Sequence, residues 1–288
     1  MATLRQIKKR ISSVKSTQKI TRAMKMVAAA KLRRAQEHII SARPYAFKLR
    51  EVLANVSARV DRSMHPLLDE RAPEKVLYVV VTADRGLCGG FNGNIIRKAE
   101  WYFKESVPGT FELICVGRKG FDYFKRREYP IIEKFTRFFD NLNYSHAQVV
   151  TDKIVELYVE KKFDQVILFY NEFKSAVQQM IVTEQLLPVK ADEQMMRSPE
   201  GNIDYEYEPE PLRLLDTIVP LNVAIQVWRV LLESSAAEHA ARMTAMENAT
   251  NNAGEMIDSL TLYYNRVRQA AITKEILEIV GGAEALQG

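Results

Sequence analysis

Apolar and small residues recur at every third or fourth position along the C-terminal part of the chain. The repeat runs through Leu232, Ala236, His239, Met243, Met246, Thr250, Ala253, Ile257, Leu260, Tyr264, Val267 and Ala271. Alternating steps of three and four residues give a period of about 3.5, which is the period of a helix that packs along a partner helix. No proline follows Pro220, and Gly254 is the only glycine between it and Gly281. We therefore expect one helix over residues 212–286, on the order of 100 Å long.

The N-terminal part of the chain shows the same repeat over residues 3–43. Its apolar or small members are Leu4, Ile7, Ile11, Val14, Ala28, Leu32, Ala35, Ile39 and Ala42. Between Val14 and Ala28 the repeat becomes polar, and a neighbouring face becomes apolar instead. The polar positions are Gln18, Thr21 and Lys25, and the apolar neighbours are Ile20, Ala23, Met24 and Val27. This change predicts a second surface that touches the helix there, or else a local stutter in the repeat.

Pro44 interrupts the N-terminal pattern, which resumes as a helix over residues 45–60. Both long helices adjoin the same middle segment of the chain, so the simplest arrangement is an antiparallel coiled coil. The second helix is longer by roughly 15–20 residues, or about 25–30 Å. Its end, residues 272–286, carries apolar side chains on more than one face. Because an isolated short helix is marginal in water, we expect another protein to surround this end.

The middle segment has the pattern of an α/β domain. Buried strands are predicted at residues 76–82, 111–117, 131–135 and 165–170, and helices at residues 94–106, 120–127 and 145–161. This alternation predicts a Rossmann-like, mostly parallel sheet, with a last antiparallel strand at residues 178–189. A polar, acidic and proline-rich segment follows at residues 190–211. We thus expect an α/β globular domain over 72–209, inserted between two helices (1–70 and 210–288) that form the coiled-coil shaft.

Charge and cysteine content add two constraints. Residues 1–43 contain twelve basic residues and one acidic residue, whereas the whole chain carries a net charge of +5. The first helix therefore favours an acidic neighbour, although a solvated helix face would look the same. Cys88 and Cys115 belong to no CxxC or Cys/His cluster, which predicts reduced thiols and no metal site. No apolar run approaches the roughly 18 residues of a membrane-spanning helix, and no secretory signal is present.

The loop after the first strand invites comparison with nucleotide-binding sites. It follows a strand and precedes a helix, where phosphates bind in such folds. Its glycines are Gly86, Gly89, Gly90 and Gly93, which match neither the dinucleotide nor the P-loop spacing. The four histidines are scattered and form no catalytic constellation. We expect no cofactor, and no nucleic acid partner either, because the basic first helix lacks aromatic residues.

Three stretches resemble the gamma subunit of the F-type ATP synthase, and the resemblance covers essentially the whole chain. They are ITRAMKMVAAAKLRRA from Ile20, TADRGLCGGFN from Thr82, and ESSAAEHAARMTAMENATNNA from Glu233, continued by YNRVRQAAITKEI from Tyr264. The chain lacks the transit extension and the cysteine-bearing insertion of organelle relatives, so it is similar to bacterial forms.

The resemblance implies a non-catalytic rotor subunit, present once in each complex. It would turn inside a ring of three alpha and three beta subunits, where ATP is made or hydrolysed on the beta subunits. The epsilon subunit and the c ring of the membrane sector would be its other partners. The complex would couple proton flow to ATP synthesis, with this chain peripheral on the cytoplasmic face of the bacterial inner membrane.

The resemblance also implies roles for individual residues. Contacts with the beta subunits fall on Met24, Lys25, Arg268, Gln269 and Thr273. Contacts with the c ring and epsilon fall on a foot that contains Tyr205, Tyr207 and Glu208. Asp84, Arg85 and Gly86 match a loop with a structural role or a contact at the foot. The alternative is an α/β nucleotide-binding enzyme with a coiled-coil dimerisation arm, which would bind nucleotide at the loop between Gly86 and Gly93.

Overall fold

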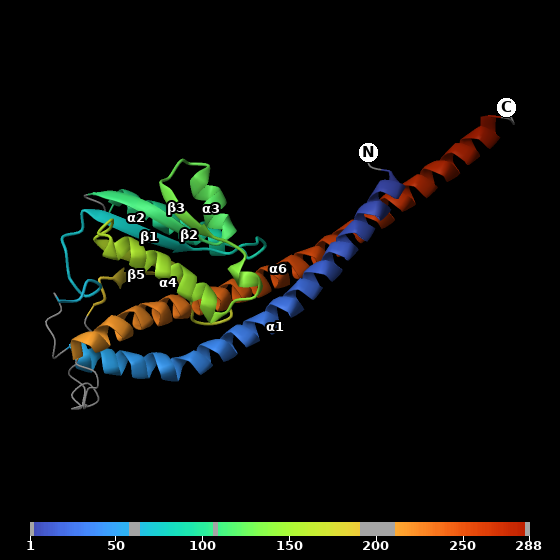
Figure 1. Ribbon diagram of the computed structural model, residues 1–288. Helices are drawn as coiled ribbons and strands as arrows, with labels where there is room; N and C mark the ends of the chain where they lie inside the picture. The colour runs from blue at the N-terminus through green and yellow to red at the C-terminus, as the bar shows by residue number, and fades with distance from the viewer. Residues whose placement is uncertain (1–2, 58–63, 106–108, 191–210, 286–288) are drawn as a thin grey trace. The chain divides into compact units, whose positions relative to one another are not determined.

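The computed structural model describes residues 3–57, 64–105, 109–190 and 211–285. The chain forms two compact units: Met1–Val27 with Met243–Gly288, here called the coil unit, and Ala28–Arg242, here called the sheet unit. Two long helices, α1 (Leu4–Ser57) and α6 (Pro211–Ala285), contribute to both units (Figure 1). Residues 191–210, which hold most of the predicted acidic segment, lie outside the described residues.

Thr3 and Gln6 define the start of α1. The backbone N–H of Thr3 donates to Oε1 of Gln6 (3.0 Å), and the backbone N–H of Gln6 donates to Oγ1 of Thr3 (3.4 Å). This reciprocal pair is a capping box, which satisfies N–H groups that have no partner within the helix. The sequence Thr3-Leu-Arg-Gln carries the corresponding signature.

Pro44 does not interrupt α1, so the prediction of a break there was wrong. The helix runs through Pro44, which is exposed to solvent. A proline inside a helix removes one hydrogen bond and costs about 3 kcal/mol. The turns that follow bury Leu49, Leu53 and Val56, and this apolar burial offsets the loss.

The sheet unit contains the predicted five-stranded sheet. Its strands are β1 (Lys75–Val81), β2 (Thr110–Val116), β3 (Ile131–Phe135), β4 (Gln165–Phe173) and β5 (Gln179–Leu187). They lie in the order β3-β2-β1-β4-β5, and only β5 is antiparallel to its neighbour. The shorter helices are α2 (Phe91–Glu105), α3 (Arg118–Lys125) and α4 (Tyr144–Val159), with a 3-10 turn at Phe138–Asp140 that the sequence did not predict. The α/β prediction is thus confirmed, although α2 begins three residues earlier than expected.

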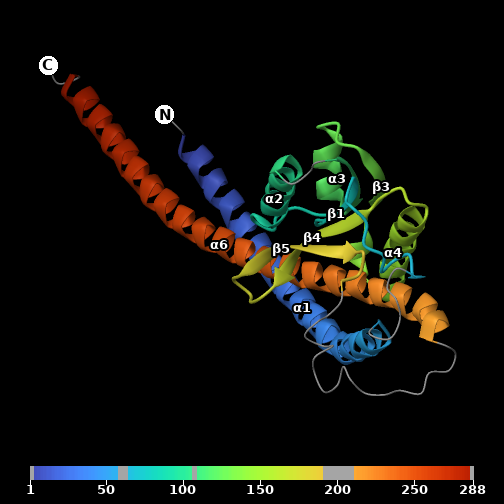
Figure 2. The ribbon, with the colours of Figure 1, turned by 90° about the vertical axis from the view of Figure 1, so that its left-hand side faces the viewer.

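Both faces of the sheet are buried, which explains why its central strands read as continuous apolar runs. Alternate residues of β1 point to opposite faces: Tyr78 lies in a core shared with α2 and α3, and Val79 in a core shared with α4 and α6. Figure 2 shows α2 and α3 over one face and the first half of α6 along the other. The first core is aromatic, with Tyr78 stacked on Phe103 at 4.7 Å between ring centroids.

The first half of α6 packs on the second face of the sheet. Its buried positions are Leu215, Val219, Val223, Val227, Val230 and Leu231, an apolar stripe at helical spacing. The Arg229 guanidinium binds the Glu184 carboxylate of β5 at 2.7 and 2.8 Å and also donates to the Tyr170 hydroxyl of β4 (3.1 Å). Both fork nitrogens of Arg229 are thus used. This geometry fixes the position of α6 along the strands. Apolar contacts alone would define that position less precisely, because they have no preferred direction.

One stretch of α6 is long and apolar enough to span a membrane by length and composition, contrary to the expectation from the sequence. Of this stretch, 44% is buried inside the protein. Core helices of soluble domains can be equally long and apolar. The buried stripe from Leu215 to Leu231 accounts for the apolar composition of the first half of α6.

Gly117 makes the turn from β2 into α3. Its φ is +96°, and a Cβ atom there would collide with the backbone carbonyl of Thr82. The Thr82 hydroxyl in turn accepts a hydrogen bond from the backbone N–H of Gly120 (2.9 Å). The close approach of two strand ends therefore requires glycine at this position.

We predict that Gly117→Ala lowers the free energy of unfolding by about 2 kcal/mol or more, because alanine brings both the strain of a positive φ and the collision with Thr82. Urea unfolding of the isolated chain measures this. Gly93→Ala is the matched control, since Gly93 lies in α2 with nothing within 4 Å of the added Cβ, and alanine there should stabilise by about 0.5–1 kcal/mol. Equal stability of Gly117→Ala and the parent would contradict the argument.

Candidate functional site

The coil unit confirms the predicted repeat. Along α6, Met246 and Ala253 are buried, and the later members Ile257, Leu260, Tyr264, Val267 and Ala271 are all half-buried. Residues between these positions are mostly exposed, so the repeat marks the face that packs against α1. Contacts run in opposite directions along the two helices: Thr21 meets Thr250, and Lys25 meets Glu247. The pair is therefore antiparallel, as expected.

The three polar positions of the α1 repeat also face α6. The Thr21 and Thr250 hydroxyls lie 2.7 Å apart, and the Gln18 amide donates to the Thr250 carbonyl at 3.4 Å. The Lys25 ammonium binds the Glu247 carboxylate at 2.7 Å. The polar side chains therefore have partners within the coil, so the repeat continues through them without a stutter. The second surface beside them stays a prediction.

The apolar face beside these positions is open in the chain by itself. Ile20 and Val27 are 60% and 57% exposed, and Ala23 is also exposed. Met24 is half-buried, and Lys25 keeps 38% of its side chain exposed despite its ion pair. The Lys25–Glu247 pair at this exposure is worth about 0–1 kcal/mol, so Lys25 can exchange Glu247 for another carboxylate at little cost.

Arg268, Gln269 and Thr273 lie on the exposed side of α6 near its end. Among the described residues, none of the three side chains has a hydrogen-bond or ion-pair partner. All residues from Ile272 to Ala283 are exposed, including Ile272, Ile276, Leu277, Ile279 and Val280. Figure 1 shows this end of α6 continuing past the start of α1. The helix end is thus long, apolar and uncovered, as the sequence predicted.

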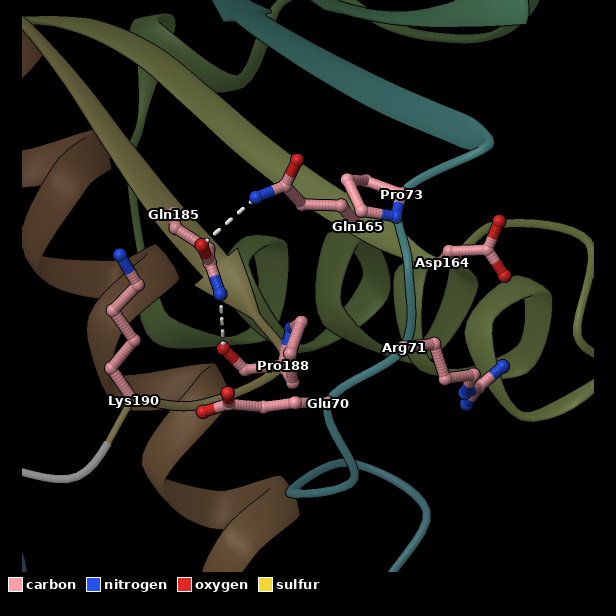
Figure 3. Close-up of a pocket in the computed structure, with 8 residues that line it drawn as sticks. All are labelled: Glu70, Arg71, Pro73, Asp164, Gln165, Gln185, Pro188 and Lys190. Carbon is pink, nitrogen blue, oxygen red and sulfur yellow. Dashed lines mark hydrogen bonds between the residues drawn. The ribbon is translucent and has the colours of Figure 1, made fainter. Parts of the chain in front are cut away.

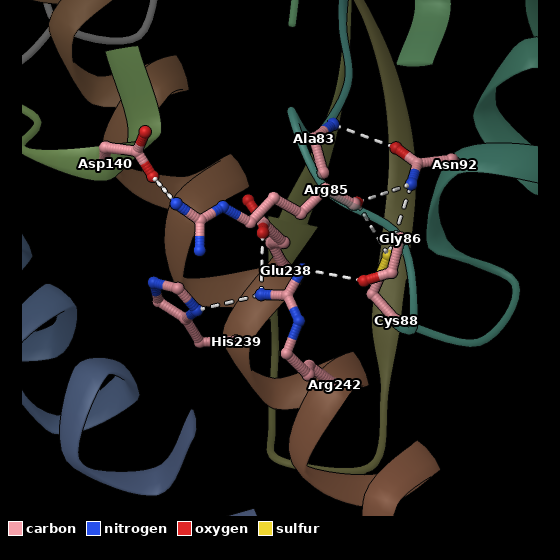
Figure 4. Close-up of polar contacts among 9 residues, drawn as sticks. All are labelled: Ala83, Arg85, Gly86, Cys88, Asn92, Asp140, Glu238, His239 and Arg242. Atoms are coloured by element: carbon pink, nitrogen blue, oxygen red, sulfur yellow. Dashed lines mark hydrogen bonds and ion pairs between the residues drawn. The ribbon is translucent and has the colours of Figure 1, made fainter. Parts of the chain in front are cut away.

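The loop with Asp84, Arg85 and Gly86 belongs to the sheet unit, and each of the three residues has a partner there. Figure 4 shows the contacts of Arg85 and Gly86. Oδ1 of Asp84 accepts the backbone N–H of Arg118, the first residue of α3 (3.0 Å). The Arg85 guanidinium binds Asp140 at 2.7 Å, and the Gly86 carbonyl accepts from Arg242 of α6 at 3.2 Å. The loop thereby ties the sheet to α3 and α6.

Two charged residues that the sequence analysis did not single out complete this cluster. Arg242 binds Glu238 at 2.7 Å, and only 12% and 5% of their side chains are exposed. The i,i+4 spacing of opposite charges, set among alanines and serines, was a usable signal. Because two buried charges need each other and further hydrogen bonds, the contact from Arg242 to Gly86 is part of what holds this pair.

The same contacts bear on the nucleotide alternative. The Asp84 carboxylate accepts the first backbone N–H of α3, the helix after β2, whereas phosphates in such folds bind at the N-terminus of the helix after β1, here α2. Cys88 and Phe91 of the glycine-rich segment are buried against Ala237 of α6. Leu87 and Gly89 have φ of +62° and +56°, so the chain turns tightly here and Gly89 allows that turn. The glycine-rich segment therefore packs on the protein itself.

A pocket of about 290 Å³ lies at the opposite edge of the sheet (Figure 3). Its polar contacts are internal: the Gln165 amide donates to Gln185 (2.9 Å), which donates to the Pro188 carbonyl (2.9 Å). The pocket is near the amino ends of β1 and β4, whereas ligands of open α/β sheets bind at the carboxyl ends. Its position gives the nucleotide-binding enzyme no support.

Other chemistry is sparse in the part of the chain that the structure describes. There, no group of three or more His, Cys, Asp or Glu side chains is placed to hold a metal ion. Both cysteines are free and buried, and burial raises the pKa of Cys115 to about 12, which leaves the thiol protonated and unreactive at neutral pH. Tyr205, Tyr207 and Glu208, the predicted foot, lie outside the described residues.

His239, a member of the α6 repeat, is buried beside Arg242. Its Nδ1 atom lies 3.4 Å from Nη1 of the Arg242 guanidinium. Burial, with the positive charges of Arg242 and Lys31, lowers its pKa from 6.5 to about 4. The imidazole is therefore neutral in the folded chain at pH 7. Below pH 6.5 the unfolded chain takes up a proton that the folded chain does not accept until about pH 4.

We predict that the parent chain loses about 3 kcal/mol more unfolding free energy than His239→Gln between pH 7 and pH 4. Urea unfolding of both proteins at several pH values measures this difference. Burial raises the pKa of Glu238, despite the opposing effect of Arg242, and this contributes with the opposite sign. That contribution is common to both proteins and cancels. Parallel pH profiles for the two proteins would refute the assignment.

The chain is similar to known proteins both in sequence and in structure. A family model described as ATP synthase matches residues 3–286. An ATP synthase gamma chain from Chlorobium phaeobacteroides (strain BS1) is 49% identical, and one from Chlorobium luteolum is 50% identical. Each alignment covers 100% of this chain and 100% of the relative.

Solved structures with the same fold come from mitochondrial ATP synthases. A chain of the central stalk and c ring from Tetrahymena thermophila is 30% identical, with a TM-score of 0.62 over 80% of this chain and 99% of that one. A chain of the Euglena gracilis OSCP, F1 and c-ring assembly has a TM-score of 0.73 over 98% of this chain and 94% of that one. It is 21% identical, and this likeness is used for the fold alone.

Proposed function

This chain belongs to the ATP synthase gamma-chain family, and we propose that it is the central-stalk rotor subunit of a bacterial rotary ATP synthase. The identity of 49–50% over full-length relatives carries this proposal. The geometry supports this proposal, because the two-helix coil ends in a single helix with exposed apolar side chains, which a ring of surrounding subunits would bury. The chain is a non-catalytic subunit, and ATP is made or hydrolysed on the beta subunits around it.

The rotor couples ion flow to catalysis through unequal contacts. A shaft with different faces touches three otherwise equivalent beta subunits differently at any moment. Such a contact shifts a subunit between conformations only by the difference in its binding free energy for them. Rotation driven by the membrane sector moves these contacts from one subunit to the next, which drives product release in turn.

We assign two groups of residues in the coil unit to beta-subunit contacts. Met24 and Lys25 form the first, beside the exposed apolar side chains of Ile20 and Val27. Arg268, Gln269 and Thr273 form the second, on the exposed end of α6. Within the described residues, the exposed basic side chains Arg5, Lys8, Lys9, Arg10, Lys15, Lys19 and Arg22 form no ion pair. This excess of positive charge favours an acidic ring interior.

The foot of the rotor remains a proposal from the sequence resemblance. Tyr205, Tyr207 and Glu208 would contact the c ring and the epsilon subunit. One copy of the chain would serve each complex, at the cytoplasmic face of the inner membrane and peripheral to it. For Asp84, Arg85 and Gly86 we propose a structural role, because all three are engaged within the sheet unit.

The rival enzyme function makes a separate prediction about the isolated chain. Equilibrium dialysis with ATP, ADP and NADH should give no stoichiometric binding, because the glycine-rich segment packs on α6 through Cys88 and Phe91. As a positive test of the rotor, purified alpha and beta subunits are combined with the chain. ATP hydrolysis should then be accompanied by rotation of a bead attached to the chain. Nucleotide bound at the Gly86–Gly93 loop would overturn the rotor proposal in favour of the enzyme.

We predict that Arg268→Ala combined with Gln269→Ala lowers ATP-driven ion pumping per ATP hydrolysed by about fivefold or more in the reconstituted complex. Both side chains are exposed, so circular dichroism and urea unfolding of the isolated variant should match the parent.

The matched control is Arg266→Ala. Arg266 is also exposed and basic, but lies about 200° around the helix from Arg268. This control should keep most of the coupling. Unchanged pumping in the Arg268→Ala and Gln269→Ala variant would remove these residues from the proposed contact.

A further inference from the structure

Gln18, Thr21 and Thr250 form a compact polar cluster between α1 and α6, next to the Lys25–Glu247 ion pair, in a seam whose other members in the coil unit are mostly apolar or small. Thr21 is only 8% exposed, and its hydroxyl lies 2.7 Å from the Thr250 hydroxyl. Gln18, one turn before Thr21, reaches the Thr250 backbone carbonyl. Three side chains from two helices thus converge on one level of the coil.

The Thr21 and Thr250 hydroxyls take part in three hydrogen-bond contacts but have only two protons to donate. Besides their mutual contact, Thr21 can donate to the Gln18 carbonyl (3.1 Å) and Thr250 to the Met246 carbonyl (2.7 Å). Two protons serve these three contacts, so one hydroxyl always donates to the other while the second donates to its own helix. If the two hydroxyls separated, each could still donate to the carbonyl of its own helix, so facing each other adds one hydrogen bond across the seam.

Gly254 gives Gln18 the space for its contact. A Cβ atom at position 254 would lie 3.2 Å from the Gln18 amide nitrogen, which is tighter than an ordinary contact. Glycine costs an α-helix about 1 kcal/mol relative to alanine. Gly254, within the 75-residue helix α6, leaves this room for the Gln18 amide, which would have to shift by a few tenths of an ångström beside alanine.

Most of the other contacts in the coil unit specify register weakly. The seam of α1 has Leu4, Ile7, Ile11 and Val14 before the cluster, and the facing part of α6 has apolar residues at the same heptad spacing. Within the coil unit alone, a shift of α6 by seven residues would again place apolar side chains opposite one another; in the sheet unit the Arg229–Glu184 pair and the core shared with α1 already hold α6. Buried polar residues at single seam positions are the known means by which coiled coils exclude such shifts.

We propose that Gln18, Thr21 and Thr250 form a register lock that fixes α1 against α6 within the coil unit, and that they act as positioning residues for the rotor. The lock sets the axial position of Met24 and Lys25 on α1 relative to Arg268, Gln269 and Thr273 on α6. This second part rests on the proposed function, in which both groups must meet beta subunits in a fixed phase.

The test replaces both hydroxyls by methyl groups, in Thr21→Val combined with Thr250→Val. Valine has nearly the shape of threonine, and removal of both partners of a buried hydrogen bond is close to neutral for stability. The full chain also carries nitroxide labels at Lys8→Cys and Asn248→Cys, both exposed positions. Cys88 and Cys115 are buried and stay unlabelled in the folded chain.

In the native register the two labels are separated by roughly 20 Å along the coil, and a seven-residue shift changes this by about 10 Å. Pulsed electron paramagnetic resonance should give one narrow distance peak with native threonines. The double valine variant should give a second peak or a broadened distribution that includes at least about a tenth of the molecules. A single unchanged peak in the double valine variant overturns the lock.

Two further variants isolate the cause. Thr17→Val combined with Thr261→Val removes two exposed hydroxyls that bond only within their own helices, and should keep the single peak. Thr21→Ser combined with Thr250→Ser retains both hydroxyls and should restore it. A second peak in the exposed-threonine control would mean that the shift reflects loss of any hydroxyl, which also overturns the lock.

In the reconstituted complex, the double valine variant should hydrolyse ATP but pump at least about fivefold fewer ions per ATP, and the double serine variant should recover pumping. A shifted register with unchanged pumping would keep the lock but overturn its positioning role. That outcome differs from failure of the proposed function itself, which the absence of any effect in the Arg268→Ala and Gln269→Ala variant would signal.

Discussion

The burial of one continuous side of α6 is the constraint on which the structure depends. Between Leu215 and Leu231 this helix supplies the apolar layer that covers one face of the sheet, together with α4 and the end of α1. Further along, Ala236, Ala237 and Ala240 are all buried, and their small side chains let other elements approach closely. In the coil unit the same helix presents the seam to α1. Since a single helix is part of both units, its sequence has to satisfy three kinds of neighbour in succession.

The fold could be predicted from the sequence because its signals are local and repeat many times. Twelve consecutive members of the α6 repeat, and β-branched runs such as residues 76–82, leave few alternatives. The error at Pro44 has a physical origin: a local rule about proline was outweighed by the apolar burial of the turns that follow it. The unexpected 3-10 turn at Phe138–Asp140 is a short element with no periodic signal of its own.

The contacts of the candidate sites were less predictable, because they join residues far apart in the sequence. Nothing near Thr21 indicates that its partner is Thr250, and nothing near Gly86 indicates Arg242. The polar positions at Gln18, Thr21 and Lys25 were visible as exceptions, but an exception alone does not say whether its partner is inside or outside the chain. Surface positions such as Arg268 were identified only through the family resemblance, since exposed residues on a helix carry no local signal of their use.

The packing of the glycine-rich segment has a consequence for a protein that works beside subunits in constant contact with ATP. The fold is one in which many proteins bind nucleotides at the turn after the first strand, and here Cys88 and Phe91 of that turn are buried against Ala237 of α6. A second nucleotide site on the rotor would compete for the substrate of the complex and would make the conformation of the rotor depend on the ATP concentration. A turn that is packed on the chain itself keeps that conformation independent of nucleotide.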